Sequence, residues 1–313
     1  MSGPADTPPA AAATWTRRAE RGSTTVMRFM VWLSLTLGRR LSRLVLHGIA
    51  AYFLLFAPAA GRASRDYLRR ILGRPPTLAE RYRHVLAFAT TIHDRIYFLN
   101  ERFGLFDIRI EGAELIDAAL ADGRGVLLFG AHLGSFEALR ALGRQHTARP
   151  VCMLMHEDNA RKINAVLAAI NPAASQDILA LGRLDSMLQL RDRLDAGHLI
   201  GVLADRTPQA DTTPLPFLGS PADFPAGPFR LAAMLRRPVL FMSGLYLGGN
   251  RYRLQFSQLA DFSAVDRPGR DAAIAAARLA YVARLEESCR SAPYNWFNFF
   301  DFWRHDGATP PPP

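Results

Sequence analysis

Short apolar runs alternate with amphipathic segments over most of the chain after residue 76. Six runs have the length of strands, and they lie at 126–130, 151–155, 177–181, 198–204, 238–244 and 252–257. Most are separated by segments whose apolar residues recur every three or four positions, at 136–145, 159–170, 184–196 and 228–237. Buried apolar strands that alternate with helices predict an α/β domain with a mostly parallel central sheet flanked by helices.

Two further helices are expected at the ends of this domain. Residues 77–100 form a long amphipathic pattern after the GRPPT sequence, and a last helical pattern covers residues 271–288. The tract YNWFNFFDFW follows at 294–303, with seven aromatic residues in ten. We interpret most of these aromatics as core residues, and the alternative is a wall for an acyl chain or an interfacial aromatic belt.

Residues 15–75 interleave apolar runs with arginines. The uncharged run at 44–61 is eighteen residues long, at the lower limit for a membrane-spanning helix, and it ends in Pro58 and Gly61. This pattern favours two helices that lie in or on the bilayer interface, and one short span is the alternative. A secretory signal fits less well because arginines interrupt the apolar stretch.

The charge of the chain is concentrated at the N-terminal end. The net charge is +10, and the first 74 residues hold twelve arginines against three acidic residues, a net +9. A basic region of this kind suits an anionic membrane surface, and the chain lacks the motifs with which nucleic-acid-binding domains read bases. The flanking segments, 1–14 and 304–313, are expected to be disordered, which leaves 76–303 as the α/β domain. Cys152 and Cys289 have no metal-ligand spacing and fit a reducing compartment.

The stretch LLFGAHLGSFEAL ends a strand at Gly130 and continues with His132 and Glu137. In open α/β sheets, functional residues gather beyond the carboxyl ends of strands. Five residues on one continuous helix correspond to a rotation of about 500°, so the two side chains would diverge. They can converge if His132 lies on the turn before the helix and Glu137 lies one turn inside it. The helix terminus would then keep His132 neutral and Glu137 would fix its tautomer, as a general base requires.

Other interpretations of this pair remain open. A histidine and a glutamate at this spacing occur by chance, and a histidine at a helix start is often a cap or a packing residue. The position after a buried strand favours catalysis, as do Gly130 and Gly134, which permit close backbone approach. A metal site lacks a third ligand with diagnostic spacing. A serine hydrolase fits less well still because LGSFE lacks the second glycine of G-x-S-x-G.

A second candidate segment is residues 201–239. Asp205 and Arg206 follow a strand and would face the same crevice as His132, where an arginine can hold a phosphate or an oxyanion. The alternative is a simple salt bridge between the two at the strand end. A fixed loop that opens the next helix, with N–H groups available to an anion, is predicted by Pro221, Pro225, Gly227 and Pro228.

Taken in chain order, these segments resemble the bacterial lipid A late-acyltransferase (lauroyl/myristoyl transferase) family of the lysophospholipid acyltransferase superfamily. The order is a basic, apolar N-terminus, GAHLGSFE, ADRTP with FLGSPADFPAGPFRLA, and YNWFNFFDFW, over residues 15–303. The chain is closer to the predicted acyltransferases of that group than to the lipid A enzymes proper.

The resemblance implies roles for individual residues. His132 and Glu137 match the catalytic motif of the superfamily, and Asp205 and Arg206 stand where the family has an aspartate-containing strand end. The block that lines the acceptor site in the family is matched by 217–219 and 224–227, with the candidate binding residues Phe217, Gly219, Phe224 and Gly227. The phosphatidate-making branch has an F-P-E-G-T-like core, and the glutamate has no counterpart here. The resemblance therefore does not extend to a glycerol-phosphate acceptor.

The resulting hypothesis is a membrane-associated acyltransferase in which His132 is the general base and Glu137 orients it. The resemblance implies an acyl carrier protein or coenzyme A thioester as donor, and a location at the cytoplasmic face of the inner membrane. The acceptor would be a hydroxyl or an amine of a lipid or glycolipid, and no metal, other cofactor or nucleic acid is implied. The basic N-terminus would attract an acidic carrier protein as well as the membrane. The alternatives are an acyl-thioester hydrolase with the same pair and a non-catalytic, membrane-peripheral lipid-binding protein.

Overall fold

The computed structural model describes residues 24–138, 150–156, 166–168, 170–171, 178–181, 184–206 and 212–303. The two ends that are expected to be disordered, 1–14 and 304–313, lie outside this part. So do most of the predicted helix at 159–170 and the second half of the one at 136–145.

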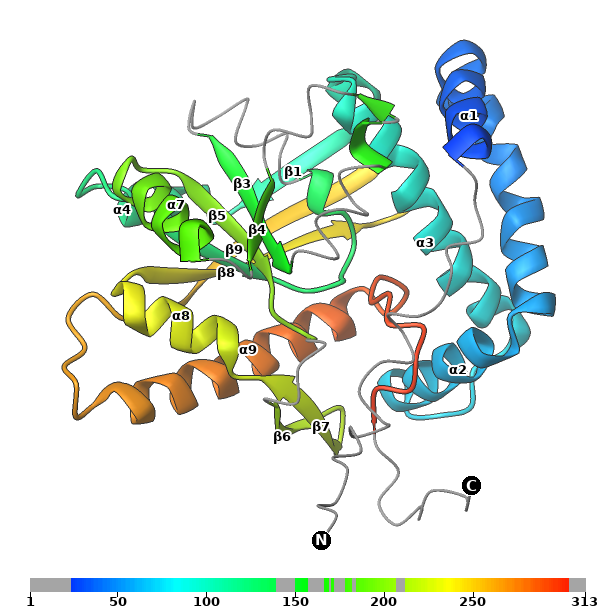
Figure 1. Cartoon of the computed structure of the whole chain (residues 1–313). Coiled ribbons are helices and arrows are strands. Elements are labelled where there is room, and N and C mark those ends of the chain that lie inside the picture. Colours follow the sequence, from blue (N-terminus) through cyan, green and yellow to red (C-terminus); the bar gives the residue numbers. More distant parts are fainter. Residues whose placement is uncertain are drawn as a thin grey trace, which may run out of the picture.

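A seven-stranded sheet forms the centre of the molecule (Figure 1). Its order is β1-β9-β8-β2-β5-β3-β4, and the bounds are β1 (Asp107–Glu111), β2 (Val126–Gly130), β3 (Val151–His156), β4 (Ile178–Leu181), β5 (Leu199–Leu203), β8 (Pro238–Tyr246) and β9 (Arg251–Asp261). Every neighbouring pair in this sheet is parallel except β8 and β9. The mostly parallel sheet predicted from the sequence is therefore confirmed. β1, an edge strand whose alternate residues are exposed, is not among the strands predicted from the sequence.

Helices cover both faces of the sheet, as the side chains of β2 show. Leu127 and Phe129 belong to a core shared with α7 (Leu184–Asp195), α8 (Gly227–Leu235) and α9 (Arg270–Ser291). Val126 and Leu128 belong to a second core shared with α3 (Leu78–Leu99) and α4 (Ala113–Ala119). Since successive side chains of a strand point to opposite faces, β2 is buried on both sides by a helix layer.

The proline-rich segment before α8 differs from the expected loop. Residues 212–217 and 220–225 pair as an antiparallel hairpin, β6 (Thr212–Phe217) and β7 (Ser220–Pro225). Within each strand the prolines stand two or four residues apart, so their missing N–H groups fall on one edge of the strand. The opposite edge keeps its donors, at the pairs Thr213–Phe224 and Leu215–Ala222. Prolines that avoid the paired edge are compatible with a two-stranded ribbon.

The N-terminal helices pack beside α3 (Figure 1). The first helix, α1 (Thr24–Phe56), has a break at Gly38, and α2 (Pro58–Leu72) follows after one residue. Among the described helices, none is long and apolar enough by itself to cross a membrane. Only α1 from Arg28 onward and α2 pass that test of length and composition together, and they are bent by 95°.

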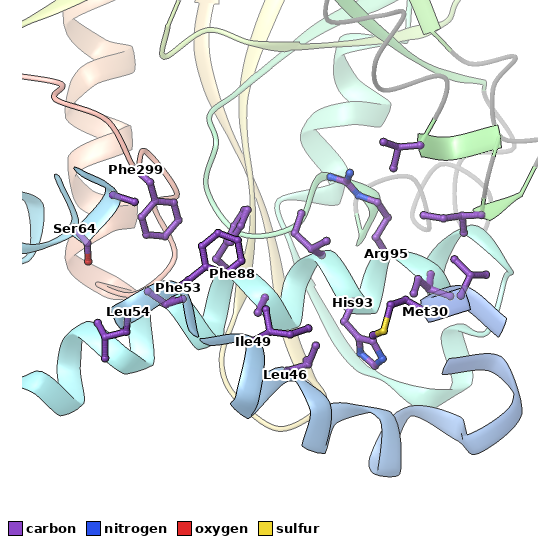
Figure 2. Close-up of a pocket in the computed structure, with 18 of the residues that line it drawn as sticks. Met30, Leu46, Ile49, Phe53, Leu54, Ser64, Phe88, His93, Arg95 and Phe299 are labelled. Atoms are coloured by element: carbon purple, nitrogen blue, oxygen red, sulfur yellow. The ribbon is translucent and has the colours of Figure 1, made fainter. Parts of the chain in front are cut away.

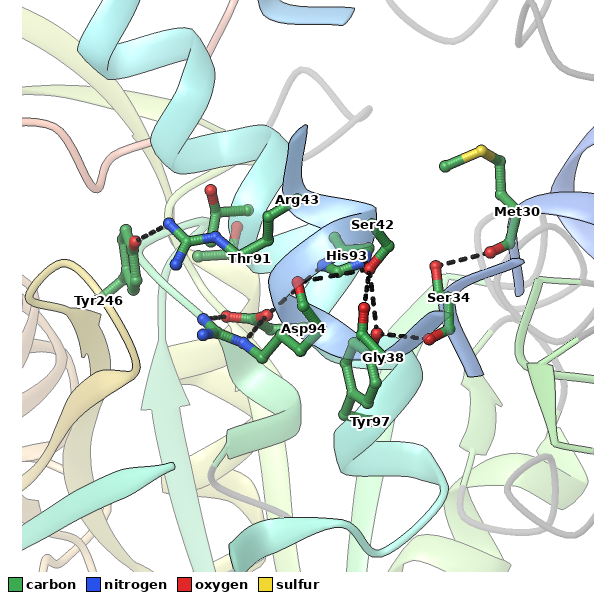
Figure 3. A network of polar contacts seen from close by, with 12 residues as sticks. Met30, Ser34, Gly38, Ser42, Arg43, Thr91, His93, Asp94, Tyr97 and Tyr246 are labelled. Atoms are coloured by element: carbon green, nitrogen blue, oxygen red, sulfur yellow. Dashed lines mark hydrogen bonds and ion pairs between the residues drawn. The ribbon is translucent and has the colours of Figure 1, made fainter. Parts of the chain in front are cut away.

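A buried polar network holds α1 against the sheet domain at its break (Figure 3). The Arg39 guanidinium donates two hydrogen bonds of 2.7 Å to the carboxylate of Asp94 on α3. The Tyr252 hydroxyl donates a third, also of 2.7 Å, and Arg39 reaches the carbonyl of Gly249 in the β8–β9 turn. Arg39 therefore faces inward, and its charge does not contribute to the basic surface that the sequence analysis assigned to this region.

Candidate active site

The register between β2 and β5 brings the two candidate segments together. Gly130, the last residue of β2, pairs with Leu203, the last residue of β5. His132 and Asp205 each lie two residues beyond these strand ends, so parallel pairing sets them side by side. The expected proximity of the two residues therefore follows from the strand register.

His132 and Asp205 form a close pair. The Nδ1 atom of His132 lies 2.8 Å from Oδ1 of Asp205, and the backbone N–H of His132 donates to Oδ2 at 3.1 Å. Asp205 is fully buried, whereas 27% of the His132 side chain is exposed. The carboxylate thus holds the ring from inside while one edge of the imidazole faces outward.

The aromatic tract at 294–303 supplies the remaining donors to Asp205. The indole N–H of Trp296 and the amide of Asn298 donate to Oδ2, at 3.3 and 3.1 Å. Burial alone would raise the pKa of Asp205, but His132 and Arg206 hold the pKa well below its usual range. Asp205 is therefore ionised. The sequence analysis interpreted this tract mainly as core, and nothing in the local pattern shows that two of its side chains reach Asp205.

The surroundings of His132 favour the neutral form of its ring. Burial and the nearby Arg206 guanidinium lower the pKa of His132 below its ordinary value of 6.5, while Asp205 acts in the opposite direction. A neutral imidazole has one N–H and one lone pair, and an ionised carboxylate only accepts. Nδ1 therefore carries the hydrogen, and Nε2 carries the lone pair. Arg206 donates its Nε–H to that lone pair at 3.1 Å.

Backbone contacts hold the loop that carries His132 on both sides. The His132 carbonyl accepts from Phe297 N–H at 2.7 Å, and the Gly134 N–H donates to the Asn295 carbonyl at 2.8 Å. Gly134 has a φ of +65°, and a Cβ at this position would lie 2.0 Å from the carbonyl oxygen of Gly244. Only glycine permits this approach, so the close contact that the sequence suggested at Gly134 is a backbone-to-backbone one.

Glu137 does not reach His132 directly. The helix after β2 begins at Phe136, so His132 lies on a separate loop and Glu137 lies in the first helical turn. The Oε1 atom of Glu137 lies 2.8 Å from Nε of Arg95 on α3, although the Arg95 N–H is not directed at it as in a hydrogen bond. The two motif side chains therefore have different partners, Asp205 for His132 and Arg95 for Glu137. The carboxylate bound to His132 is that of Asp205.

The four candidate binding residues of the 217–227 block lie apart from the imidazole. Phe217 and Phe224 are buried in the core, and the Phe217 ring packs edge-on against Trp296 with their centroids 5.2 Å apart. Gly219 lies in the exposed turn between β6 and β7, with a φ of +80°, and Gly227 is exposed at the start of α8. Phe217 thus supports Trp296, which in turn binds Asp205, and Phe224 packs edge-on against Phe217.

The model of the bacterial lipid A biosynthesis acyltransferases matches residues 14–305, nearly the whole chain. The chain belongs to this family. The resemblance seen in the sequence is confirmed, and the protein is a transferase that acts on acyl groups, in a family that acylates lipid. A search of curated proteins finds no match to the chain. Within the described residues, no cluster of three or more His, Cys, Asp or Glu side chains could hold a metal ion.

The acyltransferase has an apolar pocket beside this site (Figure 2). Its volume of about 630 Å³ lies in the range of small-molecule sites. Most of its lining comes from α1, α2 and α3, and Phe299 of the aromatic tract lies at one end in Figure 2. Arg95 also lines the pocket, so one residue contacts both the pocket and Glu137, on the helix that follows the His132 loop.

Proposed function

We propose that the protein moves a fatty acyl chain from an acyl carrier protein or coenzyme A thioester to a hydroxyl or amine of a lipid or glycolipid acceptor. His132 acts as the general base. The observation that carries this proposal is the partly exposed imidazole whose Nδ1 lies 2.8 Å from a buried carboxylate. The lowered pKa values of both groups favour a neutral ring and an ionised carboxylate. Such a ring accepts a proton at Nε2 while the carboxylate stabilises the charge that forms.

The proposed reaction has two proton transfers. Nε2 of His132 takes the proton of the acceptor hydroxyl as its oxygen attacks the thioester carbonyl. The tetrahedral intermediate then collapses, the carbon–sulfur bond breaks, and the leaving thiolate takes the proton from the imidazolium. Arg206, whose Nε lies 3.1 Å from Nε2, is suited to anionic groups of the substrates.

We assign the orienting role of the dyad to Asp205, because this carboxylate contacts Nδ1. The carboxylate of Glu137, which the motif pairs with His132, would act through Arg95 by holding that guanidinium between the loop and the pocket. Arg95 lowers the pKa of His132, so Glu137 influences the base by neutralising a cation near it.

The apolar pocket is the proposed site of the acyl chain. Its lining is almost entirely aliphatic and aromatic, and its three polar lining side chains are Ser64, His93 and Arg95. Two of these are engaged elsewhere, since Ser64 bonds His84 and His93 bonds Ser42. A pocket with only three polar lining side chains suits a hydrocarbon chain, and we place the thioester on the side of Arg95.

We propose a location at the cytoplasmic face of the inner membrane, and the outer face of α1 supports attachment to a membrane surface. Of the sixteen large hydrophobic residues exposed in the described part of the chain, ten lie on α1. Exposed arginines accompany them, at positions 28 and 40 on α1 and 62, 65 and 69 on α2. Apolar side chains flanked by arginines are suited to the interface of an anionic bilayer.

Vesicle binding tests this location. Leu44 is 67% exposed on α1, and Leu188 is 56% exposed on α7, so Leu44→Glu and Leu188→Glu form a matched pair. We expect Leu44→Glu to weaken co-sedimentation with phosphatidylglycerol vesicles and Leu188→Glu to leave it unchanged. Equal binding by both variants and the wild type would contradict the assignment of α1 to the membrane surface.

Product analysis tests the reaction. Membrane-bound protein is supplied with an acyl thioester, and the lipid fraction is examined by mass spectrometry for acylated lipid and for free fatty acid. We expect acylated lipid from the wild type and neither product above background from His132→Asn. Free fatty acid alone would identify a hydrolase, and unchanged turnover by the variant would remove His132 from the mechanism.

A further inference from the structure

Both ring nitrogens of His132 are occupied. Asp205 holds Nδ1 at 2.8 Å from the buried side, and Arg206 donates its Nε–H to Nε2 at 3.1 Å. The Arg206 guanidinium also lies against the Phe300 ring, 5.5 Å from its centroid. The nitrogen that has to accept a proton from the acceptor therefore already accepts a hydrogen bond from a cation.

We infer that, in the resting enzyme, the hydrogen bond from Arg206 keeps Nε2 of His132 from accepting a proton. Arg206 leaves Nε2 only when an anionic group of a substrate binds its guanidinium. This inference rests on the proposed role of His132 as general base. It makes Arg206 a positioning residue that couples substrate binding to the availability of the base.

An anionic group is the partner with the chemistry to displace this contact. A guanidinium binds phosphate or carboxylate oxygens through two parallel, charge-assisted hydrogen bonds, which are stronger than one bond to a neutral imidazole. Water and a neutral alcohol offer no such bidentate acceptor. A phosphate on the donor or on the lipid would therefore draw Arg206 away and make Nε2 available, whereas water alone would not.

The hydrogen bond between Arg206 and Nε2 would protect the thioester from hydrolysis. For hydrolysis, Nε2 takes a proton from water as the water oxygen attacks the carbonyl, and the leaving thiolate then takes that proton. While Arg206 occupies Nε2, water cannot deliver its proton there. The contact thus favours transfer over hydrolysis, and removing it should change the ratio of the two products.

The first experiment measures both products for two substitutions of Arg206. Arg206→Met removes the donor and the charge, and Arg206→Lys keeps the charge without the planar fork. Without acceptor, we expect Arg206→Met to hydrolyse an acyl thioester about tenfold faster than the wild type, the factor expected for a hydrogen bond from a charged donor. With acceptor present, its ratio of hydrolysis to transfer should rise, and Arg206→Lys should lie between.

The matched control is Arg284→Gln, which removes an exposed arginine on α9 that pairs, among the described residues, with Glu287 three residues away. This control should behave as the wild type in both assays. Arg206→Met hydrolysis no faster than that of the wild type, together with an unchanged product ratio, would overturn the inference.

Nitrogen-15 NMR of histidine-labelled, full-length protein in detergent reports the contact directly and does not depend on activity. The His132 signals are assigned with His132→Asn. We expect the Nε2 signal of Arg206→Met to move towards the position of an unprotonated nitrogen without a hydrogen bond, and its titration to move to higher pH. The charged groups that act on the ring are Asp205, Arg206 and Arg95, and only Arg206 changes in this comparison. An unchanged Nε2 signal would contradict the contact itself.

Two probes distinguish the sources of the anion. Coenzyme A represents the donor, and phosphatidylglycerol vesicles represent the lipid. A shift of the wild-type Nε2 signal with either probe supports the release of Nε2 by an anion and shows whether the anion belongs to the donor or to the lipid. No shift with either probe would overturn the release of Arg206 by an anion. Activity retained in His132→Asn would instead overturn the proposed function, so the two failures are distinguishable.

Discussion

Two buried aspartates of this protein have similar surroundings but different partners. Asp94 and Asp205 are both fully buried, and each accepts several hydrogen bonds from side chains far away in the sequence. Asp94 binds Arg39, which stays charged and is only 8% exposed, and the Tyr252 hydroxyl. Asp205 binds His132, the proposed base, whose side chain is 27% exposed. Burial of the carboxylate is therefore common to both sites, and the two sites differ in the side chain that the carboxylate binds.

The largest expected effect is on catalysis, from His132→Asn. The asparagine amide can still donate to Asp205 but has no basic nitrogen. We expect the rate of acyl transfer to fall by about 10²–10⁴-fold, the usual contribution of a general base, while the thermal unfolding midpoint stays close to that of the wild type. Initial rates and thermal unfolding in the same detergent check both. A large loss of stability with a small loss of rate would make the His132–Asp205 pair structural.

The second effect is a loss of stability with the rate retained, and we expect it from Asp94→Asn. This substitution leaves the buried Arg39 without its counter-ion, so the free energy of unfolding should fall by about 3–5 kcal/mol, with the rate of the folded protein retained. Chemical denaturation measures the change. Asp66→Asn, which removes the partner of the Arg69 and Arg70 ion pairs on α2, is the control and should cost no more than about 1 kcal/mol. A loss of activity in the folded Asp94 variant would break the comparison.

A third effect concerns His84, a histidine with both nitrogens bonded and no exposure. Its ring contacts the Ser64 hydroxyl and the Trp296 carbonyl, each at 2.8 Å. Burial lowers the pKa of His84 from 6.5 to about 4. Below pH 6.5 the unfolded chain binds a proton that the folded chain refuses, so stability falls as the pH drops from 6.5 to about 4. The loss is about 3 kcal/mol.

Denaturation at pH 7 and pH 4.5 checks this expectation against His84→Gln, whose amide can bond both partners without titrating. The variant should lose less stability over this interval than the wild type. An equal loss in both proteins would show that other groups cause the acid sensitivity.

The smallest expected effect is the coupling between Arg95 and Glu137. If Glu137 acts through Arg95, Glu137→Gln should change the rate of the wild type but hardly that of Arg95→Gln. A double-mutant cycle on acyl transfer should then give a coupling energy of about 1 kcal/mol. Additive effects would instead indicate that Glu137 serves His132 without Arg95, as the motif alone implies.

Much of the fold could be predicted because its strands are buried and carry a clear pattern. The apolar runs at 126–130 and 198–204 correspond to β2 and β5, and their parallel pairing brings His132, Asp205 and Arg206 into one place. β1 was missed because an edge strand with exposed alternate residues resembles a loop. The β6–β7 hairpin was missed because prolines argue against strands unless their register is known.

The carboxylate that binds His132 could not be predicted, because separation along the chain does not show which carboxylate lies nearest in the folded protein. Glu137 stands five residues from His132 and Asp205 stands 73, yet the strand register favours the distant carboxylate. The donors Trp296 and Asn298 arrive from the last described segment of the chain, through contacts that no local periodicity encodes. Local patterns predict elements, and the site depends on how these elements are joined.

The central claim is that neutral His132, held by Asp205, is the base. Its most direct test is the pH dependence of kcat/KM for the wild type, Asp205→Asn and Arg206→Met. We predict an acidic limb with an apparent pKa below 6.5, because burial and Arg206 lower the pKa of His132. Asp205 raises that pKa, so Asp205→Asn should move the limb to lower pH, and Arg206→Met should move it to higher pH. An acidic limb that stays in place in both variants would contradict the claim.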